Sequence, residues 1–246
     1  MRLYTWDEDG VRIETDCPYE PYFYHETNAS RYDAISLYGT KLRKVISSSE
    51  LNRRKRIEDL NDHKIYENIS PYQQFLVDRF WEVNESNDFS KHPLKIWFFD
   101  IETYSPDEFP KPEEASHMIN VITIYDSVEE LYYTWGINPY ETDQKDVIYT
   151  HCKNEAELLQ QFLDHYCKDR PDILSGWNSE IFDIPYIINR VRNVLGEEAT
   201  RLFSPVHSEI MKPIYQRIYR GNFGMQTIKY VVEGVSMLDY LDVYKT

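Results

Sequence analysis

The sequence predicts an α/β protein in two parts, with a smaller α+β domain over residues 1–93 and a larger α/β domain over residues 94–246. Three observations predict the larger domain. A compact apolar run at 96–99 is typical of a strand covered on both faces. Two further β-rich runs, 118–125 and 130–137, follow closely enough to form an antiparallel meander with it. Helical and strand patterns then alternate, as in a sheet flanked by helices.

The helices of the larger domain carry start and stop signals. Asn154 with Glu157 three residues later has the pattern of a capping box, and the apolar residues that follow share one helical face. A strand over 172–178 comes next, and then a helix over 184–195 that stops at Gly196. Three meander strands, a crossover helix, a strand and a second helix together predict a mixed sheet of the ribonuclease-H-like kind.

The smaller domain has the pattern of short strands followed by helical turns. Its first two strands flank an Asp-Gly dipeptide, which is a strong hairpin signal. The expected strands lie at 2–6, 11–16, 21–26 and 35–45, the helices at 48–60 and 71–81, and a polar linker at 84–88.

The composition excludes several classes of protein. No stretch approaches the roughly 18 uninterrupted apolar residues of a membrane-spanning helix, and the N-terminus lacks the apolar region of an export signal. The three cysteines are odd in number and far apart, so we expect the free thiols of a cytosolic protein. The net charge of −15 argues against binding nucleic acid by bulk attraction.

Two basic segments interrupt this acidic charge. Residues 41–56 hold seven Lys and Arg against one acid, and residues 212–229 hold four basic residues and no acid. Each segment is typical of a solvated helix or hairpin face. The 21 tyrosines could stack unpaired bases, although such tyrosines are more often half-buried strand residues.

The candidate chemistry lies in three carboxylates. Asp100 and Glu102 are two residues apart on a predicted strand, so they share a face with Cα atoms about 6.6 Å apart. Their repulsion, about 3 kcal/mol at an effective dielectric constant of about 20, would be removed by a divalent cation. Asp183 follows a later strand at the start of a helix, where the carboxyl ends of the strands meet. Oxygen ligands of this kind suit Mg²⁺ or Mn²⁺, but a solvated strand end and a helix N-cap are the plain alternatives.

The resemblance to a known family becomes specific at these residues. Phe98-Phe99-Asp100-Ile101-Glu102-Thr103 resembles the first exonuclease motif of family B DNA polymerases, and Asn178-x-x-x-Phe182-Asp183 resembles the second. The stretches 38–41, 105–110 and 175–186 are similar to the replicative polymerases of T-even-like bacteriophages.

The resemblance implies a proofreading 3′–5′ exonuclease that uses two ions, Mg²⁺ or Mn²⁺. Asp100 would bridge both ions, Glu102 would hold the ion that activates water, and Asp183 would hold the second ion.

The resemblance also implies a substrate and partners. Asn178 and Phe182 would lie along an unpaired 3′ end of primer DNA, and Phe109 would pack against its terminal bases. Core packing is an equal alternative for Phe182 and the plain one for Phe109. The partners would be the remainder of the polymerase chain, with replication accessory proteins, in the cytoplasm of a phage-infected bacterial cell and without a membrane. A hairpin over 214–235, with Gly221 and Gly224 at its tip, would help to move the primer end.

The sequence departs from the family in one respect. The family's fourth carboxylate belongs to a Tyr-x-x-x-Asp motif, and no tyrosine after Asp183 has an aspartate four places later. Asp239 and Asp242 are present, but in the relatives that segment precedes the motif. We therefore expect a fragment of a longer polymerase with an unfinished exonuclease site and weak or absent hydrolysis.

Two other functions remain open at this point. One is a non-catalytic module that binds single-stranded nucleic acid through residues 41–56 and the tyrosines, with the acids as structural caps. The other is a stand-alone nuclease of the same fold, of the type with four acidic ligands. Dependence on metal would separate the binding module from either nuclease.

Overall fold

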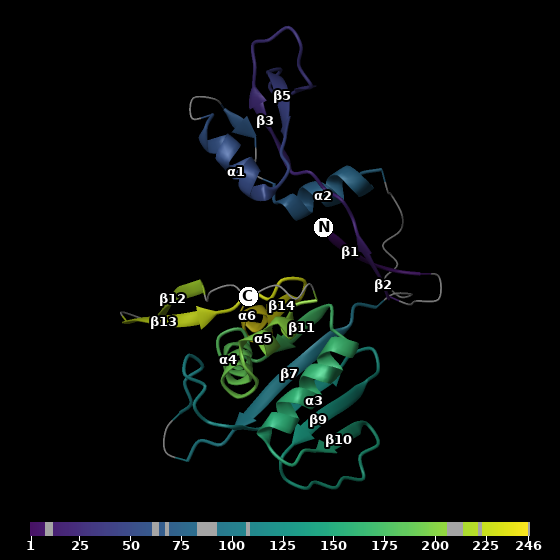
Figure 1. Cartoon of the computed structure of the whole chain (residues 1–246), viewed down its shortest axis with the longest axis vertical. Coiled ribbons are helices and arrows are strands. Elements are labelled where there is room, and N and C mark those ends of the chain that lie inside the picture. Colours follow the sequence, from purple (N-terminus) through teal and green to yellow (C-terminus); the bar gives the residue numbers. More distant parts are fainter. Residues whose placement is uncertain are drawn as a thin grey trace. The chain divides into compact units, whose positions relative to one another are not determined.

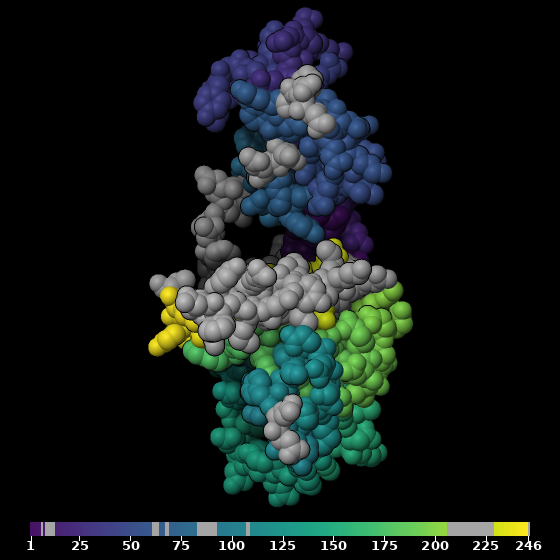
Figure 2. Space-filling model, turned by 90° about the vertical axis from the view of Figure 1, so that its left-hand side faces the viewer, coloured from purple at the N-terminus to yellow at the C-terminus, as the bar shows by residue number. Residues whose placement is uncertain are grey.

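The computed structural model describes residues 1–7, 12–60, 64–66, 69–82, 93–106, 109–205, 214–220 and 223–245. The chain divides into two compact units, Met1–His92 and Pro93–Thr246. Figures 1 and 2 distinguish them by colour, purple to blue for the first unit and teal to yellow for the second.

The first unit contains two small sheets and two helices. The hairpin β1–β2 is confirmed as an antiparallel pair, and a four-stranded sheet has the order β4-β5-β3-β6. The predicted run at 35–45 is wrong as one strand, because the chain turns at Gly39 with φ of 81° and returns as β5. The linker predicted at 84–88 lies outside the described residues. The elements are β1 (Arg2–Trp6), β2 (Arg12–Asp16), β3 (Tyr22–Glu26), β4 (Ala34–Ile35), β5 (Lys41–Ile46), α1 (Glu50–Glu58), β6 (Ile65–Tyr66) and α2 (Pro71–Phe80).

The second unit is built on a mixed sheet of six strands. The predicted meander is confirmed, because β8 pairs antiparallel with both β7 and β9. On the other side of β7, β11 and then β14 run parallel to it. The strands, in sheet order, are β10 (Val147–His151), β9 (Leu131–Gly136), β8 (Ile119–Asp126), β7 (Ile96–Thr103), β11 (Ile173–Gly176) and β14 (Ser236–Asp239). The sequence did not predict β10 or β14, which are short strands at the two edges.

The helices of this unit begin close to their predicted signals. The Glu157 amide donates to Asn154 Oδ1 at 3.0 Å, and the Glu157 carboxylate accepts from the Lys153 amide at 2.7 Å. The plain alternative for Asp183, a helix N-cap, is wrong, because Asp183 is the first helical residue of α4 and Phe182 occupies the cap. The helices are α3 (Glu155–Lys168), α4 (Asp183–Leu195), α5 (Glu197–Thr200), the 3₁₀ turn Arg201–Phe203 and α6 (Tyr240–Tyr244).

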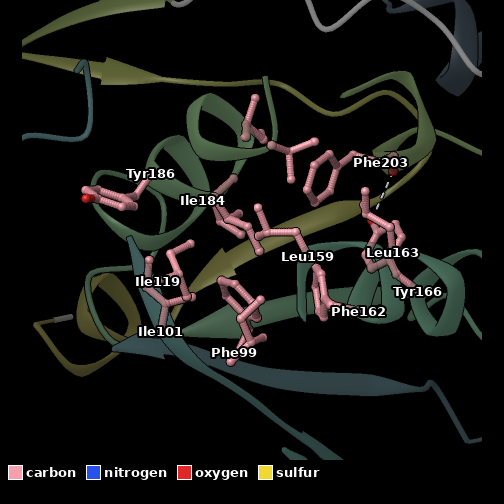
Figure 3. Close-up of a cluster of buried hydrophobic side chains, with 14 of the residues drawn as sticks. Phe99, Ile101, Ile119, Leu159, Phe162, Leu163, Tyr166, Ile184, Tyr186 and Phe203 are labelled. Atoms are coloured by element: carbon pink, nitrogen blue, oxygen red, sulfur yellow. Dashed lines mark hydrogen bonds between the residues drawn. The ribbon is translucent and has the colours of Figure 1, made fainter. Parts of the chain in front are cut away.

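The core of the second unit lies between one face of the sheet and helices α3 and α4. Figure 3 shows Phe99 and Ile101 of β7 facing side chains from these helices, with the Tyr166 hydroxyl donating to the carbonyl of Phe203 at 3.0 Å. The expectation that β7 is covered on both faces is wrong for the described residues. Along β7, buried and exposed side chains alternate, and Phe98 on the outer face is 42% exposed.

A separate two-stranded sheet is formed by the hairpin of β12 (Ile214–Arg220) and β13 (Phe223–Lys229). Gly221 lies outside the described residues, whereas Gly224 pairs with Tyr219 inside the ladder and is not at a tip. Within the described ranges, no helix has both the length and the apolar character needed to cross a membrane.

Candidate metal centre

Three parallel strands end at one edge of the sheet and carry the candidate residues there. The register pairs Ser175 of β11 with Phe98 of β7, and Gly176 of β11 with Asp239 of β14. Asp100, the loop 177–182 after β11, and Asp239 therefore lie at the same edge. Ligands of α/β sheets bind at the carboxyl ends of their strands, because the loops there leave a crevice.

The loop 177–182 is held by its backbone. The amides of Asn178 and Glu180 donate to the two oxygens of Asp239, at 2.9 and 3.1 Å. Asn178 adopts a φ of 61°, which asparagine tolerates better than most residues. A Cβ at Gly176 would come within 2.6 Å of the Phe99 carbonyl oxygen, so only glycine allows this close approach of the loop to β7.

Asp239 has a structural role. It is buried, and Oδ1 also accepts from the amide of Leu241 at 2.9 Å, which caps α6. Three backbone amides donate to its two oxygens, so this carboxylate holds the backbone of its own chain in place. It therefore does not resemble the missing fourth metal ligand.

Asp183 is the most perturbed carboxyl of this edge. It is 4% exposed, and burial together with the charge of nearby Asp100 raises its pKa to about 7. The backbone amide of Ile101 opposes this rise only in part. An acid of this kind is costly to ionise in the absence of a nearby positive charge.

Asp100 and Glu102 project from the outer face of β7. Burial raises the pKa of Asp100, and the amide of Ile101 partly lowers it. Glu102 is exposed, at the point where the register of β7 against β8 shifts. Among the residues that the structure describes, no Lys or Arg forms an ion pair with Asp100, Glu102 or Asp183.

A different set of acids meets the strict geometry of a metal site. Asp126, Glu129 and Asp169 bring ligand atoms within 4.8 Å of one another, which Asp100, Glu102 and Asp183 do not do as a set in the described chain. Lys95 occupies this second cluster, with Nζ 3.5 Å from Asp126 and 2.5 Å from Asp169. The cluster was not predicted from the sequence, because Lys95 and Asp169 are 74 residues apart and meet only through packing.

The second cluster is neutralised from within. The indole of Trp97 donates to Asp126 at 2.7 Å, and two backbone amides donate to its other oxygen. Burial alone would raise the pKa of Asp126, but these hydrogen bonds and Lys95 lower it below its usual range. The cluster fits an internal ion-pair network better than a cation site.

The carboxylates at the carboxyl edge fit a divalent cation. They offer hard oxygen donors, two of them have raised pKa values, and the described residues supply no countercharge. A bound cation would meet that need, as expected of an acidic metal centre.

The aromatic residues predicted to contact substrate lie close together. The rings of Phe109 and Phe182 have centroids 5.3 Å apart, and Phe182 stacks on Tyr186 at 5.7 Å. Phe109 is 80% exposed, while Phe182 is half-buried against α4. Phe182 thus has packing contacts as well as a position beside an exposed ring.

A groove of about 490 Å³ opens on the outer face of the sheet and includes Asp100. Sequence reasoning missed it, because an apolar run gave no sign that one of its faces is uncovered. The side chains and backbone that line it belong to Phe98, Phe99, Asp100, Thr123, Tyr125, Tyr132, Gly176, Trp177 and Tyr240.

Comparisons with known proteins agree with this geometry. Residues 50–246 match a family model described as DNA polymerase family B, exonuclease domain. The chain is 28% identical to the DNA-directed DNA polymerase of Escherichia phage RB69 and 30% identical to that of Enterobacteria phage T4, over 97% of its length in both cases. It is 26% identical to the DNA polymerase of Thermococcus litoralis over 80% of its length. The chain spans only 29% and 28% of the two phage proteins, and 13% of the third.

Proposed function

Because this chain belongs to family B of the DNA polymerases and carries the exonuclease domain of that family, we propose that it removes nucleotides from the 3′ end of single-stranded DNA. The observation that carries the proposal is the pair of adjacent carboxylates, Asp100 and Asp183, whose pKa values are raised and which have no cationic partner among the described residues. In a polymerase this activity would serve proofreading.

Two divalent cations, Mg²⁺ or Mn²⁺, would be held by Asp100, Glu102 and Asp183. Such ions supply stabilisation of the negative charge that develops on the attacking and leaving oxygens. Because the pKa of Asp183 is raised, its carboxyl group would lose a proton when it binds a cation near neutral pH.

The substrate strand would meet the aromatic side chains beside this edge. Phe109 is exposed enough to stack on a base, and its ring packs against that of Phe182. Asn178 would place its amide side chain along the same strand, on a loop whose backbone is fixed by Asp239.

The remaining proposals concern the whole protein. Residues 1–93 would be the N-terminal domain and residues 94–246 the exonuclease domain of a phage-like replicative polymerase. Its partners would be the 3′ end of primer DNA, the rest of the polymerase chain and accessory proteins. The place of action would be the cytoplasm of a phage-infected bacterial cell.

We expect slow hydrolysis from the chain of 246 residues, since it lacks the fourth carboxylate motif and Asp239 already accepts three backbone hydrogen bonds. The experiment is to add Mn²⁺ or Mg²⁺ to the chain with a single-stranded oligonucleotide labelled at its 5′ end. Slow, metal-dependent shortening from the 3′ end is expected. Asp100→Ala should reduce its rate by about 100-fold or more.

Binding of Mn²⁺, followed by its electron paramagnetic resonance, gives a second readout that does not need turnover. Asp100→Ala should weaken this binding. Glu129→Gln, in the second cluster around Lys95, is the matched control and should leave Mn²⁺ binding unchanged. Hydrolysis or Mn²⁺ binding that is the same in Asp100→Ala and in the unaltered chain would refute the proposal.

A further inference from the structure

An ion pair joins the hairpin β12–β13 to the loop 177–182, which precedes Asp183. Lys229, the last residue of β13, pairs through Nζ with Oε2 of Glu180. Glu180 lies in the loop 177–182, three residues before Asp183. The pair therefore connects the returning strand of the hairpin with the loop that leads into a candidate metal ligand.

The burial of this pair makes it more than a surface contact. The side chain of Glu180 is 12% exposed and that of Lys229 is 34% exposed. The amide of Glu180 donates to Asp239, so this residue is fixed by its backbone as well as by its side chain. Without Lys229, the described residues would leave a largely buried carboxylate without its countercharge, in a region already rich in acids.

The chain after Lys229 is anchored to a different element. Tyr230 is 5% exposed and its hydroxyl donates to Asn189 Oδ1 of α4 at 2.7 Å. The hairpin itself forms its own sheet and pairs with no strand of the six-stranded sheet in the described chain. The hairpin base thus has one attachment to α4 and, one residue earlier, another to the loop.

We propose that the Glu180–Lys229 pair is a positioning contact that makes the order of the loop 177–182, and hence the placement of Asp183, depend on the position of the hairpin. Movement of the hairpin that separates the pair would loosen the loop. The effect on hydrolysis rests on the function proposed above, whereas the effect on the loop does not.

Hydrogen exchange measures the loop directly. In Lys229→Met, the amides of Asn178 and Glu180, both bonded to Asp239, should exchange about tenfold faster than in the unaltered chain, while amides of the central strand β7 keep their rates. Glu180→Gln should have a smaller effect, because it leaves the more exposed Lys229 unpaired and adds no buried charge. The exchanged pair Glu180→Lys with Lys229→Glu should recover part of the protection.

The matched control is Lys64→Met in the other unit. Lys64 also pairs with a glutamate distant in sequence, Glu26, at 3.9 Å, but is 81% exposed. This variant should leave the exchange of the loop unchanged. With oligonucleotide and Mn²⁺, Lys229→Met should lower kcat about three- to tenfold with little change in KM, as expected when a catalytic group is misplaced and binding is kept.

The outcomes separate this inference from the proposed nuclease. Faster loop exchange in Lys229→Met, restored in the exchanged pair, supports the positioning contact even if no variant hydrolyses DNA. Unchanged loop exchange in Lys229→Met overturns it, even where the unaltered chain digests DNA in a metal-dependent way. Equal acceleration in Lys64→Met also overturns it, because the effect would then be unspecific.

Discussion

Acidic clusters lie near both ends of β7, and they differ in how their charge is balanced. Near its start, Asp126 and Asp169 surround Lys95, and every oxygen of Asp126 accepts a hydrogen bond. Toward its end, the charge of Asp100 raises the pKa of Asp183, and no described Lys or Arg forms an ion pair with either carboxylate. One cluster beside this strand therefore has its negative charge balanced by a lysine, and the other does not.

This difference shows why acid count alone is a poor guide to a metal site. The cluster around Lys95 has the tighter ligand geometry, yet the pKa of Asp126 is lowered, so its charge is already stabilised. The pKa of Asp183 is raised, so its negative charge is not stabilised by its surroundings. Perturbed carboxyls in a cleft are candidates for function for this reason.

Replacing one acid from each cluster should give the largest contrast. Asp126→Ala removes a buried acceptor and leaves Lys95, Trp97 and two amides without it, which should lower the free energy of unfolding by about 3–5 kcal/mol. Asp100→Ala relieves repulsion with Asp183 and should change that free energy by less than about 1 kcal/mol without metal. Urea unfolding followed by circular dichroism measures both values.

A similar loss of stability in Asp126→Ala and Asp100→Ala in the absence of metal would contradict this prediction. Thermal unfolding with and without Mn²⁺ gives a further comparison of the two clusters. The unaltered chain should gain stability from the ion by mass action, and Asp100→Ala should not.

The second prediction concerns pH. The folded pKa of Asp183, about 7, lies above the ordinary value of 3.8, so the folded chain holds a proton that the unfolded chain has lost between these values. Its contribution to stability therefore falls as pH rises from about 4 to about 7. Without metal, Asp183→Asn should be more stable than the unaltered chain at pH 8, by several degrees in Tm, with the difference vanishing near pH 4.

Asp126→Asn is the matched variant with the opposite sign. Its folded pKa is lowered, so the stability that it contributes is present above the ordinary aspartate pKa and is lost as pH falls through the lowered value. Asp126→Asn should thus be less stable at pH 8, and the deficit should shrink in acid. The same sign for both variants would contradict the assignment of the clusters.

The sequence predicted the acids at the carboxyl edge of the sheet better than the second cluster around Lys95. Asp100, Glu102 and Asp183 follow strand patterns at positions where carboxyl ends converge, so their edge could be inferred from local periodicity. Lys95 meets Asp169 across 74 residues, a contact that depends on packing and has no local signal. For the same reason the sequence left open the role of Asp239, which the structure assigns to the loop 177–182.

The fold was predictable where elements are long and periodic. Helices α3 and α4 and the meander of β7, β8 and β9 lie within a few residues of their predicted ranges. The short strands β10 and β14 were missed, because four or five residues give too little periodicity to separate a strand from a loop. The uncovered face of β7 was missed because residues 96–99 form an unbroken apolar run, whereas a strand with one exposed face usually alternates apolar and polar residues.

A smaller effect on stability is expected at Gly176, beside the acids at the carboxyl edge. Its missing Cβ lets the loop approach β7, and an added methyl would meet the Phe99 carbonyl at 2.6 Å and the Ser179 Cβ at 2.8 Å. Gly176→Ala should lower the free energy of unfolding by about 1–3 kcal/mol and weaken Mn²⁺ binding. Gly39→Ala in the first unit, where a Cβ meets open space but φ is positive, is the control and should leave Mn²⁺ binding unchanged. Equal Mn²⁺ affinity in Gly176→Ala would show that the loop does not set the site.

The smallest expected effect on stability separates two roles of Asn178. Its φ of 61° makes it a conformational residue, and its side chain is also the proposed contact for the DNA strand. Asn178→Gly keeps the backbone conformation and should alter the free energy of unfolding by less than about 1 kcal/mol, whereas Asn178→Val adds strain and should cost more. If the amide side chain contacts DNA, Asn178→Gly should bind a single-stranded oligonucleotide several-fold more weakly while it keeps its affinity for Mn²⁺. Unchanged oligonucleotide affinity in Asn178→Gly, measured by fluorescence anisotropy, would leave this residue with the backbone role alone.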